Sequence, residues 1–140
     1  MSKNVENLLR EICFRIKIKG REVLKDFPIT PAQFDLMQKL YFTGEKTMTD
    51  LSKMLGIAKS TTTGLVSRLE AEGFAERKRK NDDKRVITVD LTEKGKAVID
   101  KVILKRIEFV EKVIEDFDDK SKKQLIVLLV KLNESMKDYR

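Results

Sequence analysis

The 140-residue chain contains no histidine and no tryptophan, and it has a single cysteine, Cys13. The missing histidines remove the commonest metal ligand and the commonest general base of proteins. A single cysteine excludes an intrachain disulfide, and without histidine it also excludes a zinc site of the usual kind within one chain. No glycine-rich phosphate loop and no spaced pair of carboxylates takes the place of these groups. We therefore expect no metal, no cofactor and no enzymatic activity.

The chain also lacks any apolar run near the roughly 18 residues of a membrane span, and it begins without a signal-peptide pattern. We expect no membrane contact and a cytoplasmic location. Hydrophobic residues make up 41% and charged residues 38%, a mixture typical of a globular protein. This length predicts one domain, residues 1–140. The net charge of +7 favours an anionic partner.

The two ends of the chain have more apolar surface than a monomeric helical protein needs. Residues 4–26 are predicted to form a helix, because apolar residues recur there at helical spacing. Phe14 and Ile18 add apolar surface on a second face of this helix. A surface helix of a monomer buries one apolar face only, whereas a helix shared between two chains buries a second face against the partner chain.

Two further helices are predicted towards the other end, from Glu93 to about Phe117 and, after Asp118, to about Asp138. Thr92 is expected to cap the first of them. The second is apolar on more than one face, like the helix at the start of the chain. We therefore expect a homodimer in which residues 1–28 and 100–140 supply the dimerisation helices.

The sequence specifies clearly where the second helix begins. Thr30-Pro31-Ala32-Gln33 is a capping box with proline at the first helical position. This helix is predicted from Pro31 to about Phe42, before a turn at Gly44. The residues expected to face inward are Phe34, Met37, Leu40 and Tyr41.

A helix-turn-helix is predicted next. Thr49 is expected to cap a short helix from Asp50 to Leu55. Gly56 allows a tight turn, and Ile57 is expected to fill the angle between the two helices. With the hairpin described below, residues 30–95 would form a winged helix-turn-helix lobe. The predicted fold class is therefore mainly α with a small β-hairpin wing.

The helix predicted from Lys59 to Glu72 has two contrasting faces. One is a stripe expected to be buried, made of Thr62, Leu65, Val66 and Leu69. The opposite face has short hydroxyl side chains and a glycine, several of which form helices poorly. Such a face can approach the base edges and phosphates of a major groove closely. The predicted DNA-binding residues of this helix are Lys59, Ser60, Thr61, Thr63, Gly64, Ser67 and Arg68.

A β-hairpin is predicted from strands at residues 74–80 and 86–91, joined by a turn at residues 81–84. In the second strand, Ile87, Val89 and Leu91 are expected to point inward. Thr88 and Asp90 are expected to point outward, since side chains alternate along a strand.

This hairpin is strongly basic. Residues 77–85 include six basic and two acidic side chains, a net charge of +4. Neutralisation of phosphates explains such a hairpin better than exposure to solvent alone. The predicted DNA-binding residues of the wing are Arg77, Lys78, Arg79, Lys80, Lys84 and Arg85. Asp83 is predicted to hold the guanidinium of Arg85 in one orientation.

These segments resemble the MarR family of bacterial and archaeal transcription regulators over essentially the whole chain. The matching residues are Leu51-Ser52-Lys53-Met54-Leu55-Gly56, Ser60-Thr61 and Leu69-Glu70-Ala71-Glu72-Gly73. The most specific match is Arg77 with Asp83-Lys84-Arg85 and Val89-Asp90-Leu91-Thr92-Glu93-Lys94-Gly95. Ala58 departs from the family, in which a serine often caps the recognition helix, and the lost cap costs about 1 kcal/mol.

The resemblance implies a homodimer on double-stranded DNA, bound to a pseudo-palindromic operator. It places the recognition helix in the major groove and the wing arginine that matches Arg85 in the minor groove. It further implies a repressor that a small phenolic or anionic ligand releases from DNA. In many relatives that ligand lies where the dimerisation helices meet the DNA-binding lobe.

Cys13 has two interpretations. Some members of the family sense organic peroxides with a cysteine of the first helix, and they place tyrosines at the start of the second helix. Here that region offers Pro31 and Phe34 instead. A buried structural cysteine is therefore the favoured interpretation, and a redox-active thiol is the alternative.

A different class of function is a winged helix that binds protein rather than nucleic acid. The six basic residues of the hairpin argue against it. Binding to a random duplex with a steep salt dependence would separate the two hypotheses, because a module that binds only protein has no such dependence.

Overall fold

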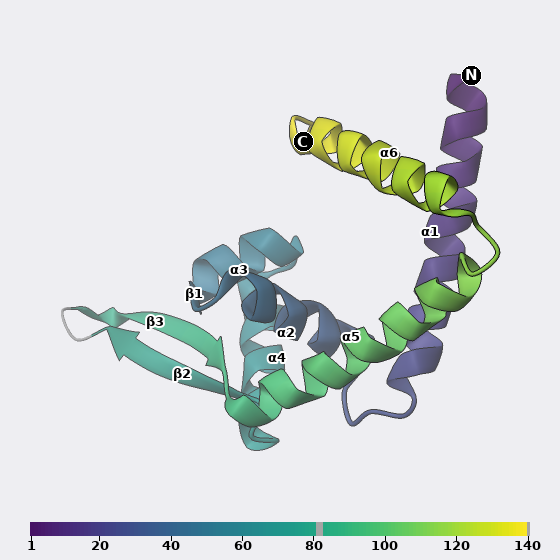
Figure 1. Cartoon of the computed structure of the whole chain (residues 1–140). Coiled ribbons are helices and arrows are strands. Elements are labelled where there is room, and N and C mark those ends of the chain that lie inside the picture. The colour runs from purple at the N-terminus through teal and green to yellow at the C-terminus, as the bar shows by residue number, and fades with distance from the viewer. Residues whose placement is uncertain (81–82, 140) are drawn as a thin grey trace. The chain divides into compact units, whose positions relative to one another are not determined.

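The computed structural model describes residues 1–80 and 83–139, and for residues 80 and 83–85 it describes the backbone alone. The elements follow in the order α1 (Ser2–Leu24), α2 (Pro31–Thr43), β1 (Lys46–Thr47), α3 (Met48–Leu55), α4 (Lys59–Ala71), β2 (Ala75–Lys80), β3 (Asp83–Leu91), α5 (Glu93–Val113) and α6 (Asp119–Lys137) (Figure 1). The chain is thus mainly helical with a small antiparallel sheet, which confirms the predicted fold class. It divides into two compact units, Met1–Lys105 and Arg106–Arg140.

The capping box of α2 forms as predicted. The backbone N–H of Thr30 donates to Gln33 Oε1 at 2.8 Å, and the backbone N–H of Gln33 donates to Thr30 Oγ1 at 3.2 Å. Of the four residues expected to face inward, three are buried and Tyr41 is half-buried. The hydroxyl of Tyr41 donates a hydrogen bond to Asp100 of α5, which raises the pKa of Tyr41 above its usual value. Leu36, absent from the prediction, is fully buried.

The sheet has a strand that the sequence analysis missed. The strand order is β1-β3-β2, and β1 pairs antiparallel with β3 through Lys46↔Val89 and Thr47↔Thr88. The prediction that Thr88 points into solvent is wrong, because its side chain is only 4% exposed. Its hydroxyl donates to Glu45 Oε1 at 2.6 Å, so the segment that leads into β1 covers this position.

The helix-turn-helix begins two residues earlier than predicted. Thr47, rather than Thr49, is the N-cap of α3, and its Oγ1 accepts the backbone N–H of Asp50 at 3.1 Å. Gly56 adopts the left-handed conformation with φ 65°, as the predicted turn requires. The expectation that Ile57 fills the angle between the helices is wrong, because it is 36% exposed.

Two buried hydroxyl groups join α3 to α4. Ser52 Oγ lies 2.9 Å from Thr62 Oγ1 and also contacts Met48 O at 2.8 Å. Thr62 Oγ1 in turn lies 3.2 Å from Ala58 O. A buried polar group is costly unless it is hydrogen-bonded, and these contacts satisfy both hydroxyls. The angle between α3 and α4 is therefore held by a specific polar contact inside the core.

The core of the first unit draws on α1, α2, α3, α4, the sheet and α5. Its buried apolar residues are Leu24, Ile29, Phe34, Leu36, Met37, Leu40, Met48, Leu51, Val66, Leu69, Phe74, Ala75, Val89, Leu91, Ile99 and Val102. Each fully buried aliphatic side chain contributes about 1.5–3 kcal/mol relative to exposure. Because α4 and both hairpin strands supply buried residues to one core, the two elements belong to one packed body.

The end of α4 is joined closely to the start of α5. Thr92 caps α5 as predicted, accepting the backbone N–H of Gly95 at 3.1 Å, and its hydroxyl donates to Gly73 O at 2.6 Å. The backbone N–H of Thr92 donates to Phe74 O at 3.0 Å. A Cβ atom at Gly95 would lie 2.1 Å from Phe74 O, so this contact has room only for glycine.

The second unit consists of the end of α5 and all of α6. The prediction that α5 continues to about Phe117 is wrong, because the helix ends at Val113. Asp118 caps α6, with Oδ1 accepting the backbone N–H of Ser121 at 2.7 Å. The hydrogen bonds with Ser121 hold the pKa of Asp118 below its usual value. None of the described residues of α6 is buried.

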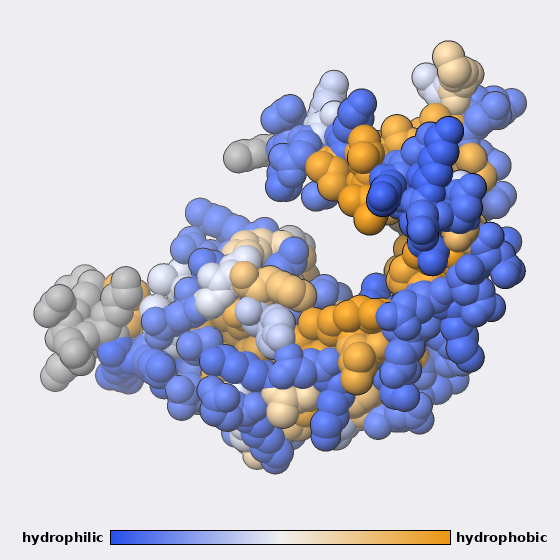
Figure 2. Space-filling model, viewed as in Figure 1, coloured by the Kyte–Doolittle hydropathy of each residue, from blue (hydrophilic) through white to orange (hydrophobic). Residues whose placement is uncertain are grey.

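The helices of both chain ends expose apolar side chains (Figure 2). On α1 these are Val5, Leu8, Ile12, Phe14, Ile16 and Ile18. On α6 they are Ile126, Val127, Leu128, Leu129, Val130 and Met136. Within the described chain α1 buries Leu24 alone, and Cys13 is exposed. The expectation of a buried Cys13 is therefore wrong for the single chain, in which the described residues leave this side chain exposed.

Across the residues that the structure describes, no helix combines the length and the apolar character needed to cross a membrane.

Candidate nucleic-acid interface

The outer face of α4 is open to solvent along its length. The seven residues predicted to contact DNA are all exposed: Lys59, Ser60, Thr61, Thr63, Gly64, Ser67 and Arg68. On the opposite side Thr62, Val66 and Leu69 are fully buried, while Leu65 is half-buried. A Cβ atom at Gly64 would meet nothing within 4 Å. The chain's own packing therefore does not require glycine at this position, whereas close approach of another molecule to the helix would.

The first turn of α4 has backbone N–H groups that no described residue accepts. Ala58 is the N-cap and makes no side-chain hydrogen bond, so the departure at this position leaves the helix start uncapped. The first intrahelical bond runs from the N–H of Thr62 to Ala58 O at 3.0 Å. The N–H groups that precede it point out of a helix end with partial positive charge. Such an end is suited to a phosphate oxygen.

The hydroxyl groups on this face are not equally available. Thr63 Oγ1 donates to Lys59 O at 2.9 Å, and Ser67 Oγ accepts a hydrogen bond from Arg77 Nη2 at 2.8 Å. Ser60 and Thr61 make no side-chain hydrogen bond within residues 1–80 and 83–139. These two exposed hydroxyls are therefore the ones most free to bond an external partner.

The hairpin of β2 and β3 extends away from the helices of the lobe, continuing from the end of α4 (Figure 1). Its register pairs Arg77 with Val89, Lys78 with Thr88 and Arg79 with Ile87, and an irregularity follows Arg79. Of the predicted wing residues, Lys78 and Arg79 are exposed. Lys78 Nζ lies 3.4 Å from Glu76 Oε1.

Strand β3 begins at Asp83, so the prediction of a turn at residues 81–84 and of a strand that starts at 86 is wrong for residues 83–85, whereas residues 81–82 lie outside the described residues. The remaining predictions for the wing concern the side chains of Lys80, Asp83, Lys84 and Arg85. They fall on the part of the hairpin whose side chains lie outside the described residues. The contacts predicted for Lys80, Lys84 and Arg85, and the orienting role predicted for Asp83, stay predictions.

Arg77 differs from its neighbours in the hairpin, because its guanidinium bonds back onto α4. Nη2 donates to Thr63 O at 3.2 Å as well as to Ser67 Oγ. Nε lies 3.2 Å from Glu70 Oε1, and Glu70 Oε2 accepts the backbone N–H of Arg77 at 3.3 Å. Glu70 is not among the site residues predicted from the sequence. Its spacing of three residues from Ser67 and seven from Thr63 places all three on one stripe of α4, a signal that would have grouped them.

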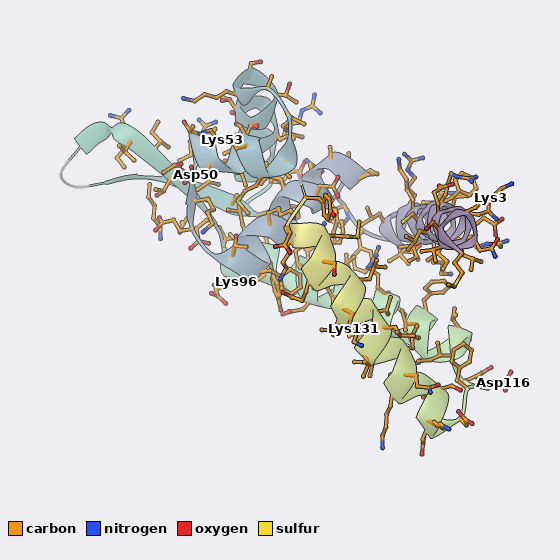
Figure 3. The ribbon with its side chains drawn as sticks, turned by 90° about the horizontal axis from the view of Figure 1, so that it is seen from above. Lys3, Asp50, Lys53, Lys96, Asp116 and Lys131 are labelled. Carbon is orange, nitrogen blue, oxygen red and sulfur yellow. The ribbon has the colours of Figure 1, made fainter. Side chains whose placement is uncertain are left out.

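A cleft of about 350 Å³ lies between the hairpin and the helix-turn-helix. Its lining residues are Thr47, Met48, Thr49, Lys59, Thr63, Arg77, Val86 and Ile87. The nearby helix α3 presents charged side chains, and Figure 3 labels two of its exposed residues, Asp50 and Lys53. Short polar side chains, backbone donors and cations thus gather on one side of the lobe, the combination that binds a nucleic-acid backbone.

The comparisons with known proteins identify the family. Residues 29–87 match the model of the MarR family. The chain is 38% identical to the uncharacterised HTH-type transcriptional regulator YsmB of Bacillus subtilis, over 96% of this chain and 92% of that protein. It is 39% identical to a MarR family protein from Bacillus stearothermophilus, whose structure matches with a TM-score of 0.91 over 97% of this chain and 95% of that one. The chain belongs to the MarR family.

This membership makes the protein a DNA-binding transcriptional regulator of the helix-turn-helix type. A further structure with the same fold is that of Streptococcus pneumoniae FabT, solved in complex with DNA. It matches with a TM-score of 0.83 at 21% identity and covers 100% of both chains. The resemblance to the MarR family stated from the sequence motifs is thus confirmed, as is the winged helix-turn-helix fold that it implied.

Proposed function

We propose that this MarR-family regulator binds a pseudo-palindromic operator as a homodimer, with α4 in the major groove and the basic hairpin along the adjacent minor groove. The observation that carries the proposal is the exposed face of α4, where Gly64 opens onto empty space beside the hydroxyls of Ser60 and Thr61, which have no hydrogen-bond partner among the described residues. A major groove admits an α-helix whose short side chains meet base edges. FabT, which has the same fold, was solved with DNA.

Different residues of this interface would contact base edges, phosphates and the minor groove. Ser60, Thr61 and Arg68 would contact base edges, while Lys59 and the free N–H groups of the first turn of α4 would contact phosphates. Lys78, Arg79, Lys80 and Lys84 would neutralise phosphates along the hairpin. Arg85 would enter the minor groove, oriented by Asp83.

Dimerisation would use the apolar surfaces of residues 1–28 and 100–140, with residues 30–95 as the DNA-binding lobe. The support is the exposure of large apolar side chains on α1 and α6, such as Phe14 at 64% and Leu128 at 62%. Soluble monomers rarely expose contiguous apolar surface of this kind. A two-fold dimer would place its recognition helices about 34–36 Å apart, on successive turns of one face of the duplex.

We further propose that the bound dimer represses transcription and that a small phenolic or anionic ligand releases it. Support comes from family membership, because many members of the family behave in this way. The exposed thiol of Cys13 keeps peroxide sensing as the alternative mode of release. Both kinds of effector belong in one titration against the protein–operator complex.

Selection of bound oligonucleotides from a random library tests the proposal directly. We expect an enriched inverted repeat, bound by two chains and with an affinity that falls steeply as salt rises. Sedimentation of the complex gives the stoichiometry. An enriched site without two-fold symmetry, or a stoichiometry of one chain per site, would contradict the dimer. Absence of salt-dependent binding to any duplex would favour the protein-binding module instead.

A further inference from the structure

The ion pair between Arg77 and Glu70 joins the hairpin to the recognition helix. Val89, the register partner of Arg77, is fully buried, and residues directly opposite in an antiparallel pair lie on the same face of a sheet. The side chain of Arg77 therefore leaves β2 on the side of the helices. There its guanidinium meets three successive groups along one stripe of α4: Thr63 O, Ser67 Oγ and the Glu70 carboxylate.

We propose that Glu70 and Arg77 are a positioning pair that fixes the hairpin against α4 and thereby sets operator selectivity, and that Arg77 does not bind phosphate. The inference rests on the proposed function, since it concerns how the same interface discriminates between duplexes. It reassigns Arg77 and Ser67, both of which the sequence analysis placed among the direct DNA contacts. Their polar groups bond to each other at 2.8 Å.

The arrangement depends on the carboxylate of Glu70. Within the described chain, Arg77 Nε is shielded from solvent and makes no hydrogen bond of good geometry. Its close neighbour is Glu70 Oε1 at 3.2 Å, and the two side chains are about a third exposed, at 32% for Arg77 and 34% for Glu70. A shielded guanidinium donor without a counter-charge is unfavourable. Loss of the Glu70 charge would therefore let Arg77 leave α4 and swing into solvent, beside the surface that meets DNA.

A hairpin held against α4 favours discrimination between the operator and other duplexes over high affinity for any duplex. With a fixed hairpin, the contacts of α4 and those of the hairpin form together only on a duplex whose shape fits both elements. A rigid lobe also loses little conformational entropy when it binds. A hairpin released from α4 would follow the backbone of any duplex, and a mobile Arg77 would add one more phosphate contact. Glu70, an acidic residue beside a basic surface, would thus weaken non-specific binding while strengthening the preference for the operator.

A double-mutant cycle tests the pair. Glu70→Gln, Arg77→Gln and the double variant are compared with wild type by titrating the selected operator and a random duplex over a range of salt concentrations. Glu72→Gln is the matched control, because it removes the same charge from an exposed residue at the end of α4, and the described side-chain bonds of Arg77 go to Thr63, Ser67 and Glu70 instead. Thermal melting of each variant establishes that it is folded.

For Glu70→Gln we expect tighter binding to the random duplex, with a salt slope steeper by about one, and an operator preference reduced by about tenfold. Arg77→Gln should reduce the preference similarly with the salt slope of wild type, and the double variant should match Arg77→Gln. Glu72→Gln should strengthen binding to both duplexes alike and leave the preference unchanged.

A salt slope shallower by about one in Arg77→Gln would overturn the inference, because it would show that Arg77 neutralises a phosphate in wild type. An unchanged operator preference in folded Glu70→Gln would overturn it as well. Failure of the proposed function has a different signature, in which wild type itself does not prefer the selected operator over the random duplex.

A measurement on the wild-type protein avoids the risk that a variant fails to fold. The ¹⁵N signal of Arg77 Nε, assigned through its loss in Arg77→Lys, reports whether the guanidinium is held. We expect a restrained signal in the free protein that stays restrained and little shifted when operator DNA is added. A signal that is mobile in the free protein, or that shifts strongly on adding DNA, would overturn the inference.

Discussion

The helix-turn-helix lobe and the chain ends use apolar residues in opposite ways. In the lobe, Leu36, Met37, Leu51, Val66 and Val89 are completely buried by other parts of the same chain. Along α6 no described residue is buried, although its apolar residues are large and numerous. The lobe therefore contains the partners of its own core, whereas the ends expose apolar surface of a kind that soluble monomers rarely carry. Under the proposed function, recognition and assembly would reside in segments with different packing requirements.

A substitution that disrupts the apolar surface of the chain ends should have the largest effect on dimerisation and on operator affinity. Leu128→Glu places a charge on the exposed apolar surface of α6, and we expect monomeric chains whose operator affinity falls by at least about a hundredfold, since two linked half-sites bind far more tightly than one. Sedimentation and gel-shift titration measure the two effects. Phe42→Glu is the matched control in the lobe, because Phe42 is 67% exposed against 62% for Leu128. A dimer that survives Leu128→Glu would remove α6 from the interface.

Within the lobe, a buried and an exposed glycine allow packing and DNA contact to be tested separately. Gly95→Ala should destabilise the protein by about 1–3 kcal/mol, because its Cβ atom would overlap Phe74 O at 2.1 Å. Gly64→Ala should instead raise stability by up to about 1 kcal/mol, because it improves helix propensity in open space, while operator affinity falls. Urea unfolding and gel shifts distinguish them. Equal stability changes in the two variants would refute the contact at Gly95.

Arg85→Ala tests the hairpin apart from the dimer. We expect operator affinity to fall by more than about tenfold, since one groove contact that specifies sequence contributes roughly 1–3 kcal/mol. Sedimentation should show an unchanged dimer, because the chain ends are untouched. If gel shifts show wild-type affinity, Arg85 is not the minor-groove contact.

The smallest effect is expected at the cap of α6. Hydrogen bonds with Ser121 lower the pKa of Asp118, so this carboxylate stabilises the fold above its ordinary pKa of 3.8, and the contribution is lost as the pH falls through the lower folded value. Asp118→Asn keeps a capping side chain that does not titrate. Its melting temperature should therefore decline less than that of wild type between about pH 5 and pH 2. Identical acid profiles would show that Asp118 contributes nothing to the pH dependence.

Predictions from the sequence succeeded where one short segment contains both partners of an interaction. The capping box of Thr30 and Gln33, the left-handed Gly56 and the cap Thr92 all depend on neighbours within a few residues. The exposed face of α4 followed from helical periodicity alone. Motifs within these segments also sufficed to indicate the MarR family.

Predictions failed where a distant segment changes the environment of a residue. Thr88 follows the outward alternation of its strand, but Glu45, 43 positions away, covers it. The two-residue strand β1 has no pattern of its own and exists because β3 pairs with it. From the sequence alone, Thr47 and Thr49 are equally suited to cap α3. In the structure Thr47 is the cap, and Thr47 is also the residue of β1 that pairs with Thr88 of β3.

Local structures and the polarity of their surfaces follow from the sequence: the capping box of α2, the turn at Gly56, the small polar face of α4 and the basic hairpin. The bonds from Arg77 back to α4, and the need for glycine at position 95 against Phe74 O, become visible in the folded chain alone. The physical reason is the range of the interactions. Capping and periodicity involve atoms a few residues apart, whereas these contacts form only after the core has brought α4, β2 and α5 together.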